Sequence, residues 1–113
     1  MSSANDADRQ ETLDRFSEAV NMTAAELEKW LDTDRSRDVG QKDGAGESVG
    51  HASGRRIVEL LRSRKDDLSD SDLAHMRKVT GYVRRHMAQR PEGDVSDTRW
   101  RYSLMNWGHD PEK

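Results

Sequence analysis

The stretch NMTAAELEKWL, residues 21–31, contains the clearest helix start in the chain. Thr23 is placed to cap the helix, and Glu26 three residues later can reach back to the Thr23 amide, as in a capping box. Met22 and Leu27 occupy the two positions of a hydrophobic staple, which fixes the direction from which the chain enters the helix. This stretch therefore predicts a helix that buries one face.

The rest of the chain repeats the helical pattern and contains no strand pattern. Apolar residues three and four positions apart predict helices over about residues 8–20, 23–33, 53–65, 70–89 and 97–107. Residues 1–7 are small and polar, and we expect a disordered tail there. The prediction is an all-α fold: a compact bundle of four to five short helices that forms a single domain over residues 8–113.

Composition limits what this domain can be. Of the 113 residues, 32% are hydrophobic and 36% are charged, so the core must be small. Cysteine is absent, which excludes disulfides and thiolate metal sites. No apolar run has the length of a membrane span, and the N-terminus lacks the apolar segment of a secretion signal. We therefore expect a soluble cytoplasmic protein with no membrane partner.

Glycine is concentrated before the third predicted helix, where residues 44–56 read GAGESVGHASGRR. The spacing is G-x-G-x-x-x-G, no strand precedes it and the lysine of a P-loop is missing, so no nucleotide site is predicted. We expect a long, irregular Gly-rich loop over about residues 34–51. Ser53 and Gly54 would then open a helix with Arg55 and Arg56 in its first turn, where free amides favour a phosphate or a carboxylate.

Two further glycines stand at informative positions. Gly81 lies in the middle of the predicted helix 70–89, where it costs about 1 kcal/mol relative to alanine. Either a close helix crossing or a simple tolerated defect would explain it. Gly108 follows the last helix and suits the left-handed position that ends many helices, with Pro111 just beyond it.

Charge is unevenly distributed along the chain. Residues 1–50 contain 12 acids and 6 Lys or Arg, whereas residues 51–113 contain 10 acids and 13 Lys or Arg. The basic side chains of the helices 53–65 and 70–89 are candidates for a surface that contacts DNA phosphates. They are Arg55, Arg56, Arg62, Arg77, Lys78, Arg84 and Arg85. The alternative is a protein–protein module or homodimer, in which these residues pair with the acidic N-terminal half.

Catalytic and metal-binding patterns are missing. The four histidines show neither H-x-x-x-H nor H-E-x-x-H spacing, so we predict no metal and no cofactor. The weakest alternative is an enzyme or ligand site in the loop around Glu47, Ser48 and His51. That site would require these side chains to converge with His109 or with the region of Trp107 around a pocket. We expect a binding protein, not an enzyme.

Four blocks carry a family resemblance: MTAAELEKWL, GESVGHASGRRIVELLRSRK, DLAHMRKVTGYVRRHMAQRPEGD and DTRWRYSLMNWGHDP. They resemble a family of small bacterial and fungal proteins classed as a domain of unknown function, over about residues 12–113. Members of this family are often labelled DNA-binding proteins. The resemblance therefore implies nucleic-acid binding, assigns no residue to it and implies no catalytic residue.

Overall fold

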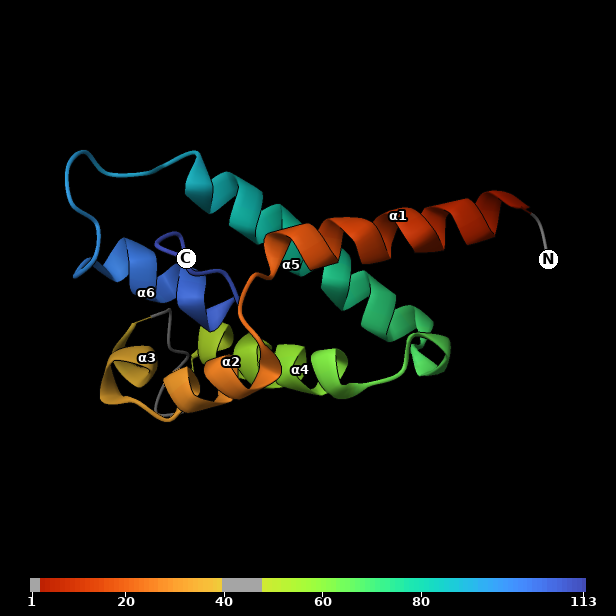
Figure 1. The fold of residues 1–113 in the computed structure, drawn as a ribbon, viewed down its shortest axis with the longest axis horizontal. Coiled ribbons are helices and arrows are strands. Elements are labelled where there is room, and N and C mark those ends of the chain that lie inside the picture. Colours follow the sequence, from red (N-terminus) through yellow and green to blue (C-terminus); the bar gives the residue numbers. More distant parts are fainter. Residues whose placement is uncertain (1–2, 40–47) are drawn as a thin grey trace.

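The computed structural model describes residues 3–39 and 48–113, and over these ranges it is built from helices (Figure 1). No strand occurs in either range, so the all-α prediction is confirmed. The elements are α1 (Ser3–Ala19), α2 (Ala24–Leu31), α3 (Asp34–Asp38), α4 (Val49–Arg62), the 3₁₀ turn η1 (Lys65–Asp67), α5 (Asp70–Met87) and α6 (Arg99–Asn106). α1 begins at Ser3, earlier than the predicted start at Asp8, and residues 1–2 lie outside the described ranges.

The helices form two packed pairs joined by a shorter helix. α1 packs along α5, and α2 packs along α4. α6 contacts α2, α3, α4 and α5, and so connects the two pairs (Figure 1). The shared core contains apolar side chains from both pairs and from α6, and four of them are completely buried: Leu27, Ile57, Val79 and Leu104.

Capping boxes begin two of these helices, and the one that begins α2 is the box predicted from the sequence. At α2, Glu26 N donates to Thr23 Oγ1 at 3.1 Å, and Thr23 N donates to Glu26 Oε1 at 2.8 Å. At α5, the same pair of bonds joins Ser69 and Asp72, at 3.1 and 3.0 Å. Each box satisfies two amides that have no partner inside the helix, and thereby fixes where the helix begins.

The predicted loop over residues 34–51 is wrong at both ends. At its start, Ser36 N donates to Thr33 Oγ1 at 3.2 Å, and this cap begins the short helix α3. At its end, α4 begins at Val49, because Ser48 caps it by accepting a hydrogen bond from His51 N at 3.1 Å. Residues 40–47 lie outside the described ranges.

Gly50 and Gly54 are packing residues of α4, and this explains its early start. A Cβ atom on Gly54 would lie 2.6 Å from the carbonyl oxygen of Asn106 and 2.6 Å from Leu31 Cδ2. A Cβ atom on Gly50 would lie 3.2 Å from Trp107 Nε1. Only glycine lets the backbone of α4 approach α6 this closely, and the contact offsets the poor helix propensity of glycine.

The early start also removes the predicted anion site. Arg55 and Arg56 are the seventh and eighth residues of α4 rather than members of its first turn. The amides around them are used inside the helix, so they cannot bind an anion. The prediction that free amides at this point of the helix bind a phosphate or a carboxylate is therefore wrong, although Arg56 does contact a carboxylate, that of Asp72.

Asn106 is the polar centre of the junction between α2, α3 and α6. Its side chain is completely buried. Its Oδ1 accepts hydrogen bonds from Trp30 Nε1 at 2.8 Å and from Ser36 Oγ at 2.6 Å. Its Nδ2 donates to the Ser36 carbonyl at 3.0 Å. One side chain therefore satisfies polar groups from two other helices in a place that water does not reach.

The C-terminal segment closes over the connection between α1 and α2. Gly108 has φ of 81°, as predicted, and a Cβ atom there would lie 2.9 Å from Val20 Cγ1. The Asn21 side chain exchanges two hydrogen bonds with the Asp110 backbone, at 2.9 and 2.8 Å. Asp110 is held in turn by Arg101 through two contacts of 3.1 Å.

Gly54→Ala should destabilise the fold by about 1–3 kcal/mol, because the added methyl group overlaps backbone and core atoms that cannot move away. Gly81→Ala is the matched control. A Cβ atom there meets only the flexible Arg85 guanidinium, at 3.0 Å, so no close helix crossing explains this glycine. Gly81→Ala should stabilise the fold by up to about 1 kcal/mol. Urea unfolding measures both changes, and equal effects would contradict this account of Gly54.

Asn106→Ala should lower the free energy of unfolding by about 3 kcal/mol, because it leaves buried partners on Trp30 and Ser36 without hydrogen bonds. Chemical unfolding followed by tryptophan fluorescence measures the loss. A change below about 1 kcal/mol would show that water replaces the lost bonds and that the junction does not depend on Asn106.

Candidate nucleic-acid interface

Two of the seven candidate basic residues are used in ion pairs between helices. Arg56 on α4 contacts Asp72 at the start of α5, with 3.3 Å between Nη2 and Oδ1. Arg62 Nη1 lies 2.7 Å from Glu28 Oε2 on α2. Both guanidinium groups thus have an internal carboxylate partner, and a phosphate would have to compete with it.

Four candidates form one exposed strip on α5: Arg77, Lys78, Arg84 and Arg85, called the α5 strip from here on. Residues 73–91 contain five Lys or Arg and no Asp or Glu. Arg77 Nε donates to Thr12 Oγ1 at 3.1 Å, which orients this guanidinium without neutralising it. Among the side chains that the structure describes, no ion pair joins Lys78, Arg84 or Arg85 to a carboxylate.

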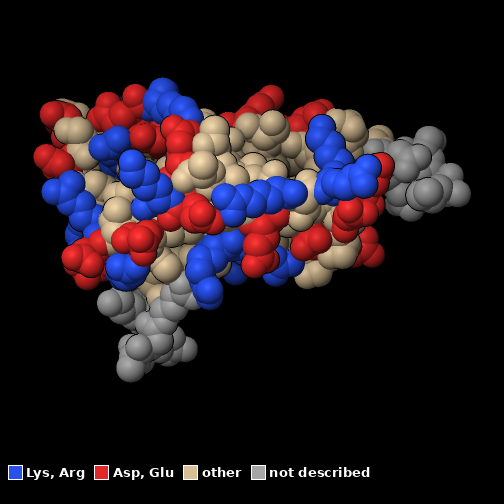
Figure 2. All heavy atoms as spheres, turned by 60° about the horizontal axis from the view of Figure 1, so that its bottom comes forward, with Lys and Arg blue, Asp and Glu red and all other residues tan. Residues whose placement is uncertain are grey.

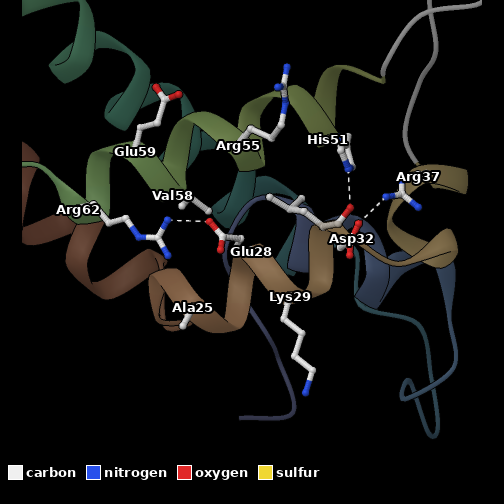
Figure 3. Close-up of a pocket in the computed structure, with 11 residues that line it drawn as sticks. Ala25, Glu28, Lys29, Asp32, Arg37, His51, Arg55, Val58, Glu59 and Arg62 are labelled. Carbon is white, nitrogen blue, oxygen red and sulfur yellow. Dashed lines mark hydrogen bonds and ion pairs between the residues drawn. The ribbon is translucent and has the colours of Figure 1, made fainter.

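Arg55 belongs to a different surface, the groove between α2 and α4 (Figure 3). Charged side chains of both signs line this groove around an apolar floor that includes Leu31 and Val58. Two pairs in the groove are already joined: Arg62 with Glu28, and Arg37 with Asp32 at 2.8 Å. With four basic and three acidic side chains, the groove is nearly charge-balanced and favours a polyanion less than the α5 strip does.

The molecular surface beside this groove is also mixed in charge. Figure 2 shows the face turned toward the bottom of Figure 1, where basic and acidic side chains alternate. Exposed ion pairs such as Arg37 with Asp32 place charges of both signs side by side at the surface. The seven predicted residues thus do not form one positive surface, and the α5 strip is the part that remains as a candidate interface.

His51 and His109, the two histidines of the predicted loop site, make contacts that stabilise the fold. His51 Nε2 lies 2.7 Å from the Leu31 carbonyl, and His109 Nδ1 lies 2.7 Å from the Ala19 carbonyl. Each ring thus reaches the last carbonyl of a helix, which has no partner inside that helix. His51 and His109 line different grooves. Ser48 is 2% exposed and acts as a helix cap.

The prediction that these side chains converge with His109 is therefore wrong for the described members of the set, because His51 and His109 line different grooves and Ser48 is buried. Glu47 lies outside the described residues. Within the part of the chain that the structure describes, no three His, Asp or Glu side chains come together as metal ligands.

A serine–histidine pair that the sequence analysis missed lies between α4 and α5. Ser53 Oγ is 3.0 Å from His75 Nε2, and Ser53 is only 5% exposed. Ser53 lies inside α4, where the neighbouring amides are used in helix hydrogen bonds. Acyl transfer requires free donors beside the nucleophile, so this geometry fits a structural contact between the two helices.

The other side of α5 packs against α6 through a ladder of aromatic rings. In order along the ladder, the rings are His75, Trp107, Tyr82, His86 and Trp100. Successive ring centroids are 6.4, 4.3, 5.2 and 5.9 Å apart, and the rings are parallel within 16°. Burial lowers the pKa of both histidines below the usual value of 6.5, so the ladder favours neutral imidazoles.

The comparison with family models supports the resemblance. The model described as "protein of unknown function (DUF3140)" matches residues 15–105. The chain belongs to this family. The match covers most of the chain, but its description names no DNA, ligand or reaction. No curated protein and no solved structure matches the chain. Among the described helices of this family member, none has both the length and the apolar composition to cross a bilayer.

Acid should destabilise the fold in two steps. As the pH falls through 6.5, the unfolded chain binds protons before His75 and His86 do in the folded chain, so the free energy of unfolding decreases. A second decrease follows below about pH 4, because hydrogen bonds hold the pKa of Asp72 and Asp94 below 3.8 in the folded state.

The double variant His75→Gln, His86→Gln separates the two steps. It should remove the decrease between pH 7 and about pH 5 and keep the decrease below pH 4. Urea unfolding at a series of pH values measures both. An unchanged slope near pH 6 in the variant would show that the two rings do not account for the first step.

Proposed function

We propose that this protein binds DNA without sequence specificity through the α5 strip, and that it does so without catalysing a reaction. The observation that carries this proposal is the set of exposed cations on one side of α5. Lys78, Arg84 and Arg85 have no carboxylate partner among the described residues, and Arg77 keeps its charge beside Thr12. Unneutralised cations on a rigid helix are the groups that bind phosphates by releasing counterions.

The strip supports contact with the phosphate backbone rather than reading of bases. Four cations within nine residues span about 12 Å along a helix. The described side chains on the same side between them are small, and no exposed aromatic ring lies in the strip. Tyr82 and His86, which could stack on bases, are held in the ring ladder with α6. Such contacts position a nucleic acid and carry no sequence information.

The other three candidate residues lie outside the α5 strip, so the proposed interface is smaller than the one predicted from the sequence. Arg56 and Arg62 are paired with Asp72 and Glu28, and Arg55 lies in the nearly charge-balanced groove. We therefore assign the interface to four residues instead of seven. An interface of this size predicts modest affinity and a strong dependence on salt.

A protein partner is the second candidate. Helix α1 exposes Glu11, Asp14 and Glu18, and these acids could contact the α5 strip of a neighbouring copy. Light scattering over a range of concentrations and salt tests this alternative. A salt-sensitive homodimer that does not bind DNA would favour it over the first proposal.

Neutralising the strip should abolish DNA binding. We expect the wild type to bind a 20-base-pair duplex at 20 mM salt, with log K falling against log salt with a slope of roughly −3 to −4, as four phosphate contacts require. The double variant Arg84→Gln, Arg85→Gln should bind at least about tenfold more weakly and show a slope reduced by about 2. Fluorescence anisotropy with a labelled duplex measures both quantities.

The double variant Arg56→Gln, Arg62→Gln is the control, because it removes the same net charge from paired residues. It should keep most of the affinity and nearly the full slope. Equal losses in the two double variants would mean that only net charge matters. Absence of binding by the wild type at 20 mM salt would refute the proposal itself.

A further inference from the structure

We infer that a phosphate group of DNA binds at Gly81. At this position the DNA backbone approaches the α5 main chain between four cations. The inference rests on the proposed function and specifies where within the α5 strip the closest contact is made. It starts from a glycine that no contact with another helix explains. Gly81 is partly exposed, and a Cβ atom there would meet only the Arg85 guanidinium.

The surroundings of Gly81 are cationic on every side along the helix surface. On an α-helix, the nearest surface neighbours of a residue are three and four positions away in both directions. For Gly81 these four neighbours are Arg77, Lys78, Arg84 and Arg85. All four are exposed, and α5 continues as a regular helix through this segment. The missing side chain therefore leaves a shallow depression at the centre of four positive charges, and the Arg85 guanidinium lies over it, with Nη1 3.0 Å from the place of a Cβ atom.

An anion explains both features of this place, the charges and the missing side chain. Four like charges around one point repel one another, and a glycine inside a helix costs about 1 kcal/mol relative to alanine. A phosphate at the depression would offset the repulsion, and the absence of a Cβ atom would let it approach all four cations closely. Glu18 on α1 lines a groove beside Arg84 but forms no ion pair with it, so the strip keeps its positive charge.

Filling the depression without changing charge tests the inference. Gly81→Leu adds a side chain at the centre of the four cations, where the atoms that it meets are those of the flexible Arg85 guanidinium. It should weaken binding of the 20-base-pair duplex about tenfold at 20 mM salt, because the phosphate is held away from the cations. Gly81→Ala should weaken binding by less, while it stabilises the fold. Urea unfolding of each variant confirms that the helix is intact.

Ala74→Leu is the matched control. Ala74 is exposed on the same side of α5, one heptad earlier, and two of its four surface neighbours are Asp70 and Ser71 instead of cations. This variant should keep the wild-type affinity within about twofold. If Gly81→Leu binds the duplex as the wild type does, while Arg84→Gln, Arg85→Gln still loses binding, the inferred phosphate position at Gly81 is overturned. The proposed function is then unaffected. Absence of duplex binding by the wild type would overturn both.

Discussion

The structure depends on the close approach of α4 to α6 and α2 at Gly54. The backbone of α4 lies so near the Asn106 carbonyl and the Leu31 side chain that a methyl group does not fit between them. This approach sets the depth at which α6 lies between the two helix pairs. It also brings Asn106 to the point where one side chain can satisfy groups on both Trp30 and Ser36. Once α6 is fixed there, its rings determine how α5 packs against it.

α5 has three sides with different roles, and this division is the main link between fold and proposed function. One side contributes Met76, Val79 and Val83 to the core. A second side presents His75, Tyr82 and His86 to the rings of α6. The third side faces solvent and bears the α5 strip. Because two sides are held by packing, the cations of the third stand on a rigid support, which preserves their spacing when a ligand approaches.

Local patterns could be predicted from the sequence, and tertiary contacts could not. Each of the caps at Thr23 and Ser69 is formed within four consecutive residues, so the local sequence is sufficient to predict such a cap. Gly50 indicated a loop and Gly54 a helix start because glycine has poor helix propensity, and only the position of α6 shows why both lie within a helix.

The same difference between local patterns and tertiary contacts applies to the candidate interface. The basic residues were visible in the sequence, but the partners that neutralise Arg56 and Arg62 are 16 and 34 residues away along the chain. Nothing local distinguishes these two residues from Arg84 and Arg85. The role of Asn106 was not visible for the same reason, because its partners are 70 and 76 residues away.

The most direct test of the account is a map of backbone amide chemical shifts during titration of the ¹⁵N-labelled protein with a short DNA duplex. We predict that the largest chemical-shift changes at low salt cluster on α5 between Arg77 and Ala88 and are centred on Gly81. These changes should disappear at high salt. Changes centred on the groove between α2 and α4, or no change at saturating duplex, would contradict the account.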